Sequence, residues 1–297
     1  MTSDGARRVA VIVNPAAGGG RAGRKLGAVT EALLAAGLEH RVQPTKSLDH
    51  AVELALEAAA DGWVAAGMGG DGLVGAVAGA LRHSDGIVGV LPGGRGNDLA
   101  RVLGIPSEPA AAVGVLASGV VRPLDLGEVH GRTFVGIASC GFDSEANRVA
   151  NEVRLVRGNL VYAYGAIRAL IGWRPARFEL ALDGGRRHVV TGYSVGAANS
   201  KAYGGGMYAA PGAELDDGLL DVVTLADMPK RRFLTSLMPK VFKGTHVQEP
   251  EVTVLRTAQV TISADRPFTI YADGDPIAEL PVTVRALPAA VQVIVPT

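Results

Sequence analysis

The chain has 297 residues, with 29 basic and 29 acidic residues and a single cysteine, Cys140. The balanced charge argues against an extended nucleic-acid surface, while one cysteine excludes an internal disulfide and fits a cytoplasmic protein. The first residues lack the apolar core of a signal peptide, and no segment offers the roughly 20 apolar residues of a transmembrane helix.

Short apolar runs alternate with Ala/Leu-rich helical patterns up to about Asp125. This alternation predicts an α/β domain with a parallel sheet, and the length of the chain suggests a second domain after it. The predicted strands are Val9 to Val13, His40 to Gln43, Trp63 to Met68 and Ile87 to Leu91. The predicted helices are Arg21 to Ala36, Leu48 to Ala60 and Leu73 to His83.

After Asp125 the pattern becomes rich in strands. The predicted strands are Thr133 to Ala138, His188 to Ala197, Gln259 to Ser263 and Phe268 to Ala272. Helical stretches are expected at about Ser144 to Gly172 and Pro229 to Lys243. We therefore expect a nucleotide-type α/β domain over 1–125, completed by 288–297 with a last strand near Val291 to Val295, and a β-rich, sandwich-like domain over 126–287.

Three glycine-rich turns follow predicted strands of the first domain. They read NPAAGGGRAGR from Asn14, GGDG from Gly69 to Gly72, and PGGRGND from Pro92 to Asp98. At the carboxyl edge of a parallel sheet, glycines let the backbone approach a ligand, and the following helix N-terminus favours an anion. The turns predict a phosphate-bearing ligand, although glycine after a strand is also ordinary loop chemistry.

Other motifs carry less weight. Gly18, Gly20 and Gly23 match G-x-G-x-x-G, but the acid expected at the end of the second strand is missing, and no P-loop is present. Ser194 lies in G-x-S-x-G within a continuous predicted strand, whereas a nucleophile elbow needs a strand, a sharp turn and then a helix. The six histidines are scattered without the spacing of zinc ligands.

The order of the turns resembles the diacylglycerol kinase catalytic-domain family. Asn14-Pro15 with Gly18, then GGDG, then P-x-G-x-x-N-D look like its nucleotide signatures. PGAELDDGLLDV from Pro211 and YADGD near Asp275 continue the match along almost the whole chain. The resemblance implies a fold similar to phosphofructokinase and NAD kinase, with ATP as phosphate donor and Mg²⁺ as cofactor.

The resemblance also implies roles for individual residues. The residues that would hold the nucleotide are Asn14, Pro15, Ala16, Ala17, Gly18, Thr45, Gly69, Gly70, Asp71, Gly72, Gly94, Arg95 and Asn97. Asp275 occupies the proton-acceptor position, and Asp125 matches another acid of the site region. Asp217, with the carbonyls of Glu214 and Leu219, resembles a structural magnesium site, although D-D-G is also a common turn.

Asp71 and Asp98 stand beside backbone donors, where carboxylates can organise magnesium around phosphates. Their alternative role is to cap the helices that follow them, and the two roles are compatible.

Several positions depart from the family pattern. Leu73, Gly75 and Ala76 stand where Thr, Asn and Glu are usual, Arg95 replaces a Thr, and Asp275 replaces a Glu. These changes leave the fold unaffected but bear on catalytic efficiency and on the phosphate donor. A nucleotide-binding protein with little kinase activity, or a kinase of another acceptor such as NAD, a sphingoid base or phosphatidylglycerol, stays open.

The acceptor is expected to be a lipid, most simply diacylglycerol, reached by peripheral contact with a membrane. Pro229 to Lys243 combines basic and apolar residues and is a candidate for that contact, or packs on its own domain. The sequence leaves the oligomeric state open, a homodimer included.

Overall fold

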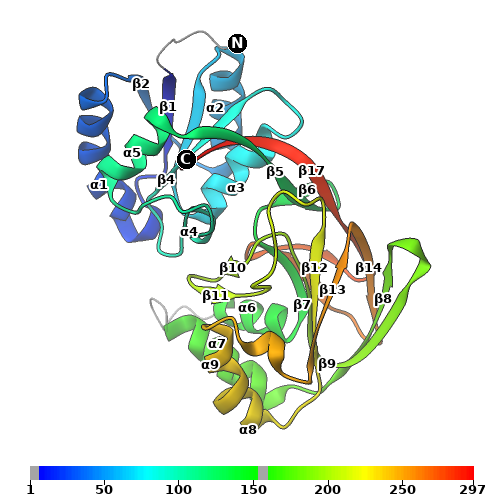
Figure 1. The fold of residues 1–297 in the computed structure, drawn as a ribbon. Coiled ribbons are helices and arrows are strands. Elements are labelled where there is room, and N and C mark those ends of the chain that lie inside the picture. Colours follow the sequence, from blue (N-terminus) through cyan, green and yellow to red (C-terminus); the bar gives the residue numbers. More distant parts are fainter. Residues whose placement is uncertain (1–6, 153–159) are drawn as a thin grey trace. The chain divides into compact units, whose positions relative to one another are not determined.

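The computed structural model describes residues 7–152 and 160–297, which form two compact units (Figure 1). The first unit comprises residues up to Leu126 together with Pro288–Thr297, and the second comprises Gly127–Leu287. Two strands, β5 and β17, contribute residues to both units and pair with each other.

The first unit contains a parallel sheet in the order β2-β1-β3-β4-β17. Its strands are β1 (Arg8–Val13), β2 (Glu39–Pro44), β3 (Val64–Gly69), β4 (Ile87–Pro92), β5 (Val120–Val129) and the end of β17 (Val282–Val295). Its helices are α1 (Ala17–Ala35), α2 (Leu48–Ala60), α3 (Asp71–Ala80), α4 (Asp98–Val102) and α5 (Pro109–Ser118).

Helices cover both faces of this sheet. α1 packs beside α5, and α2 packs beside α3 (Figure 1). Right-handed crossovers place these pairs on opposite faces, because the chain steps from β1 to β2 in one direction and returns to β3 in the other. The pattern of β1 agrees: Val9–Val13 are all buried, as expected of a strand covered on both sides.

Local chemistry explains where the helices begin. The Ser47 hydroxyl caps α2 by accepting a hydrogen bond from the His50 amide at 3.1 Å. At the start of α1, Gly18, Gly19 and Gly20 have φ of 63°, 72° and 83°, a left-handed conformation that only glycine adopts without strain. The regular part of α1 therefore begins near Arg21, where the sequence predicts it.

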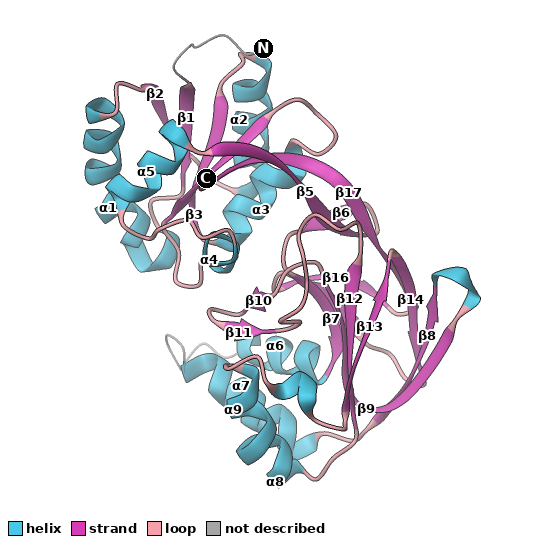
Figure 2. Cartoon of the chain, viewed as in Figure 1, coloured by secondary structure: helices cyan, strands magenta, loops and turns pink. Residues whose placement is uncertain are grey.

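The second unit is mainly antiparallel (Figure 2), with strands in the order β16-β15-β7-β9-β8-β14-β17 and with β12 and β13 added beside β9. Its strands are β6 (Arg132–Phe134), β7 (Ile137–Gly141), β8 (Ala176–Leu182), β9 (Arg187–Ala198), β10 (Ala202–Tyr203), β11 (Met207–Tyr208), β12 (Leu220–Ala226), β13 (Val252–Thr257), β14 (Gln259–Ala264), β15 (Thr269–Ala272) and β16 (Asp275–Glu279).

Its helical segments lie at one end of the unit's strands: α6 (Phe142–Glu152), α7 (Leu160–Gly172), and a continuous run of α8 (Lys230–Arg232), a π-helical turn (Phe233–Leu237) and α9 (Met238–Val241) (Figure 1). Short 3-10 turns occur at Asp183–Gly185 and His246–Gln248. The helix expected over Ser144 to Gly172 is described as α6 and α7, and its 153–159 part lies outside the described residues.

Strand alternation builds the core of the second unit. In β8, Ala176, Phe178, Leu180 and Leu182 are buried while the intervening side chains are exposed, the pattern of a strand with one solvated face. Cys140, on β7, is also buried, and burial raises the pKa of its thiol. The fold expected from the sequence, an α/β unit followed by a β-rich unit, is confirmed.

Asp143 gives the second unit a pH-dependent stability. Burial raises the pKa of Asp143 to about 6, and a hydrogen bond from the Ser194 hydroxyl opposes the shift in part. The folded protein therefore binds more protons than the unfolded chain between about pH 4 and pH 6, so this carboxyl makes stability fall as pH rises through that window.

We expect Asp143→Asn to raise the free energy of unfolding at about pH 7 by roughly 1–3 kcal/mol. Urea unfolding checks this, since the difference from wild type should shrink towards pH 4; a pH-independent difference would contradict it.

Candidate functional site

The three glycine-rich turns lie at one edge of the parallel sheet. The strands that precede them, β1, β3 and β4, are neighbours with the same direction, so their carboxyl ends meet. The first turn spans residues 14–20, the second 69–72 and the third 92–98.

Backbone contacts join these turns directly. The Gly93 amide donates to the Gly69 carbonyl at 2.8 Å. A Cβ added at Gly94 would lie 2.4 Å from the Cα of Gly70, and one added at Gly18 would lie 2.9 Å from the Gly93 carbonyl oxygen. Main chain therefore rests on main chain, which only glycine permits, and the edge presents a surface made mostly of peptide groups.

Asn14 and Asn97 hold the turns in shape. The Asn14 Oδ1 accepts a hydrogen bond from the Ala16 amide at 3.1 Å. The Asn97 side chain bonds both polar groups of Gly94, accepting from its amide at 2.8 Å and donating to its carbonyl at 3.2 Å. Asn97 itself has φ of 50°, a left-handed value that Asn tolerates better than most residues. The polar atoms of these two side chains thus shape the backbone.

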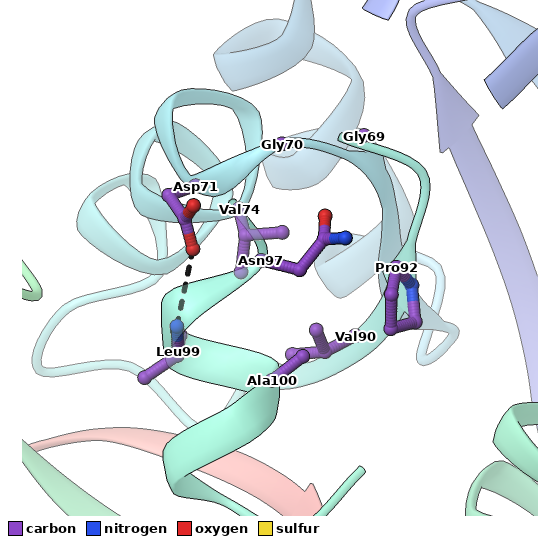
Figure 3. Close-up of a pocket in the computed structure, with 9 residues that line it drawn as sticks. All are labelled: Gly69, Gly70, Asp71, Val74, Val90, Pro92, Asn97, Leu99 and Ala100. Atoms are coloured by element: carbon purple, nitrogen blue, oxygen red, sulfur yellow. Dashed lines mark hydrogen bonds between the residues drawn. The ribbon is translucent and has the colours of Figure 1, made fainter. Parts of the chain in front are cut away.

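Asp71 links the second turn to α4. Its Oδ1 accepts a hydrogen bond from the Leu99 amide at 3.1 Å, in the first turn of α4 (Figure 3). Burial raises the pKa of Asp71; the Leu99 amide lowers it and the charge of Asp98 raises it further. Asp71 therefore binds the amino end of α4, whereas the sequence had suggested it as a cap of α3, the helix that follows it.

The small pocket in Figure 3 is a packing gap. Gly69, Gly70, Asp71, Val74, Val90, Pro92, Asn97, Leu99 and Ala100 line it, and it leaves no room for a water molecule. A nucleotide would have to bind on the outer surface of the turns.

The remaining predicted residues of the first unit have structural contacts. Asp98 is buried and forms an ion pair with Arg101 on α4. The Asp125 carboxylate is also buried and accepts a hydrogen bond from the Ala289 amide at 2.7 Å, which ties β5 to β17. The Thr45 amide donates a hydrogen bond to the Val13 carbonyl at 2.8 Å. Thr45 therefore lies next to the start of the first turn.

Two guanidinium groups lie beside the first turn. An Nη atom of Arg95, from the exposed part of the third turn, would be 3.4 Å from a Cβ at Gly19. An Nη atom of Arg24 donates to the Gly19 carbonyl at 3.3 Å and would lie 3.1 Å from a Cβ at Gly20. Positive charge next to peptide groups suits a phosphate. The sequence interpretation included Arg95 but missed Arg24, which stands one helical turn after the glycines.

The acids of the D-G-D segment lie in the second unit. The Asp273 carboxylate accepts hydrogen bonds from three successive amides: Val135 at 2.8 Å, Gly136 at 3.0 Å and Ile137 at 3.1 Å. Asp275 begins β16, is exposed, and pairs with Ala272 of β15. Asp273 therefore fixes the β15–β16 turn to the start of β7, while the Asp275 side chain faces solvent.

In the acidic turn before β12, the guanidinium group of Arg256 lies beside Asp217. Asp217 Oδ1 accepts a hydrogen bond from the Leu219 amide at 3.0 Å, and its Oδ2 pairs with Arg256 of β13. Arg256 also pairs with Asp221 at 3.3 Å, and burial raises the pKa of Asp221, with Asp217 and Glu214 as weaker causes. Within residues 7–152 and 160–297, no group of three or more His, Cys, Asp or Glu is arranged to hold a metal ion. A magnesium at Asp217 would have to displace Arg256, so these side chains do not fit it as they stand.

Comparison with known proteins places the chain in a family. The model of the diacylglycerol kinase catalytic domain matches residues 8–129, and that of the YegS C-terminal NAD kinase beta sandwich-like domain matches residues 136–295. The chain belongs to the diacylglycerol kinase family of lipid kinases. The resemblance inferred from the glycine turns is thereby confirmed.

Individual members of the diacylglycerol kinase family are similar over most of the chain. A diacylglycerol kinase of Mycobacterium tuberculosis strain H37Rv is 37% identical over 234 residues, 77% of this chain and 75% of that protein. A YegS-like lipid kinase of Pseudomonas fluorescens strain Pf-5 is 33% identical and covers 91% of this chain and 90% of its own.

Solved structures share the fold. A diacylglycerol kinase structure from Bacillus anthracis strain Sterne superposes with a TM-score of 0.75 at 20% identity, covering 99% of this chain and 98% of that one. An NAD kinase of Archaeoglobus fulgidus in complex with ATP gives 0.51 at 14% identity, covering 97% and 93%.

One departure from the diacylglycerol kinase family pattern has a structural reason. Leu73 stands where Thr is usual, and it is 4% exposed with its Cδ2 2.7 Å from where a Cβ at Gly69 would lie. The side chain packs beneath the second turn as part of the core.

Arg256→Met tests whether the acidic turn needs a positive charge beside Asp217 and Asp221 for its stability. Without the guanidinium, Asp217 and Asp221 repel each other, and we expect the free energy of unfolding to fall by about 1 kcal/mol. Added Mg²⁺ should then raise the thermal midpoint of the variant and leave that of the wild type unchanged. Scanning calorimetry with Mg²⁺ or with a chelator checks both, with Arg187→Met, an exposed residue of β9, as control. A wild-type midpoint that falls in chelator would contradict this expectation.

Proposed function

We propose that the protein is an ATP-dependent lipid kinase that transfers the γ-phosphoryl group of MgATP to the hydroxyl of a lipid, diacylglycerol being the simplest acceptor. The observation that carries this proposal is the joining of three glycine turns into one peptide surface, flanked by Arg24 and Arg95. Peptide N–H groups and guanidinium groups bind phosphate oxygens without a covalent step, which suits phosphoryl transfer.

The first-unit residues divide into binding and supporting roles. Residues Asn14 to Gly18, Thr45 and Gly69 to Gly72 would border the nucleotide, and Arg95 would contact its phosphates. Asn97, Asp71 and Asp98 would act by holding the turns and α4 in shape, as their hydrogen bonds and ion pair indicate. Mg²⁺ would enter with ATP and spread the charge of the transferred group.

Asp275 would take the proton of the acceptor hydroxyl. It is exposed on a turn that Asp273 fixes through three amides, so the position of its backbone is well defined. A carboxylate in reach of the hydroxyl is the usual general base for this reaction. Asp125, buried in β5, supports the fold near the end of the first unit.

The lipid acceptor implies a peripheral contact with a membrane at the cytoplasmic side. None of the helices in the described part of the chain is both long and apolar enough to cross a bilayer.

The assay is phosphate transfer from radiolabelled ATP in detergent micelles, with products separated by chromatography. Diacylglycerol, a sphingoid base, phosphatidylglycerol and NAD are offered separately. We expect labelled phosphatidic acid from diacylglycerol. Labelled NADP without lipid would favour a soluble acceptor, and ATP binding by calorimetry without any product would favour a nucleotide-binding protein.

A further inference from the structure

Two stretches of the second unit contain no acidic residue. Residues 153–178 and 228–248 carry Lys and Arg but neither Asp nor Glu, in a chain whose total charge is balanced. The first stretch contains α7 and the second contains α8, the π-helical turn and α9. Within these helices, α7 carries Arg168 and α8 carries Lys230, Arg231 and Arg232.

The two stretches pack together. The Lys230 Nζ donates to the Ile171 carbonyl at 2.9 Å, which joins α8 to the end of α7 (Figure 1). On their inner sides, Leu170 and Trp173 share one core cluster with Phe233 and Leu237. The two helices therefore present their outer sides together.

The outer side combines exposed aliphatic and basic side chains. Ile171 is 75% exposed, Ile167 is 50% exposed and Leu234 is 48% exposed. Arg168, Lys230 and Arg231, on the same segments, are also exposed. We call these six residues the α7–α8 face. Three aliphatic side chains this exposed on two segments that pack together form an apolar patch of the kind that marks an interaction site.

The neighbouring basic residues have internal partners. Arg232 pairs with Glu249 at 2.9 Å and also with Glu251, and Lys240 pairs with Glu249. Phe233 and Leu237 are buried. The segment Pro229 to Lys243, considered from sequence as one membrane-binding element, thus divides into an inner part that packs on its own unit and an outer part that belongs to the α7–α8 face.

We propose that the α7–α8 face docks on an anionic lipid bilayer. Ile167, Ile171 and Leu234 enter the boundary between headgroups and acyl chains, while Arg168 and Arg231 contact lipid phosphates. A second copy of the chain is a poorer occupant, because pairing this face with itself would oppose like charges without acids to neutralise them. The proposal rests on the proposed function only in that the substrate is a lipid.

Vesicle sedimentation tests the docking. The vesicles contain phosphatidylcholine alone or with phosphatidylglycerol, at low and high salt. We expect the wild type to sediment with the anionic vesicles, less at high salt. Ile171→Ser should lower the partition coefficient about tenfold, and Arg168→Gln or Arg231→Gln about fivefold each. The matched controls are Leu34→Ser, 66% exposed on α1, and Arg187→Gln on β9, which should bind as the wild type does.

The outcomes separate this proposal from the kinase activity. Activity on diacylglycerol in detergent micelles should be unchanged in all five variants. Equal sedimentation of wild type and α7–α8 variants, or no sedimentation of the wild type, would overturn the docking while leaving the kinase assignment intact. A change from dimer to monomer in Ile171→Ser, measured by ultracentrifugation without lipid, would also overturn it in favour of an interface between copies.

Discussion

Asp275→Asn is expected to lower kcat for lipid phosphorylation by about 10²- to 10⁴-fold, the usual contribution of a general base. The amide keeps the shape of the side chain but cannot take the proton of the acceptor hydroxyl. Because Asp275 is exposed at the start of β16, we expect little change in the thermal midpoint. Calorimetry should show the wild-type affinity for MgATP, so the loss is confined to turnover.

Two further variants make the Asp275 test specific. Asp265→Asn, an exposed acid in the turn before β15, is the control and should keep full activity. Asp273→Asn should instead lower the free energy of unfolding by roughly 1–3 kcal/mol, because an amide cannot replace a carboxylate that accepts from Val135, Gly136 and Ile137. An Asp275→Asn enzyme with wild-type kcat would show that another group is the base.

The sequence could predict the parallel strands and the placement of the glycine turns, because both follow from local patterns. Val9–Val13 is a continuous apolar run ended by Asn-Pro, and glycines follow three such strands. Parallel neighbours bring their carboxyl ends together, so one edge for all three turns was predictable. The prediction of a polar ligand site at this edge therefore needs no long-range information.

Contacts between residues far apart in the chain could not be predicted, because they produce no local pattern in the sequence. Asp71 bonds the amide of Leu99, 28 residues away, and Asp273 bonds amides more than 130 residues away. The pairing of Arg256 with Asp217 depends on the register of β12 against β13, which no local property fixes. Sequence alone therefore presented Asp71 and Asp217 as candidates for metal binding without revealing the partners they have.

Two features of the second unit, strand β8 and the break in the helix after Pro229, have local signals in the sequence. The alternation of Ala176–Leu182 is that of a half-buried strand, so β8 was predictable from the sequence as well. The segment after Pro229 was expected as one helix, whereas a π-helical turn interrupts it just before Pro239, whose ring nitrogen cannot donate to the preceding turn.

Gly94→Ala is expected to disrupt the whole edge of the sheet. The new Cβ would lie 2.4 Å from the Cα of Gly70, 2.9 Å from Asn97 Oδ1 and 3.0 Å from the Gly70 amide nitrogen. Two of these atoms are backbone, so the second and third turns must separate by about 1 Å to reach ordinary contact distance. A shift of this size in groups that orient a substrate costs about 10²-fold in kcat/KM, and overpacking costs roughly 1–3 kcal/mol of stability.

A matched glycine shows whether the contact, and not the added methyl group, is responsible. A Cβ at Gly114, inside α5, would meet no atom within 4 Å, so Gly114→Ala should keep full activity and gain roughly 0.5–1 kcal/mol from helix propensity. Calorimetry with MgATP, run well below each thermal midpoint, should find weakened binding in Gly94→Ala alone. If Gly94→Ala folded and bound MgATP like the wild type, nucleotide binding would not depend on the close approach of these turns. The joining of the three glycine turns would then no longer support the kinase proposal.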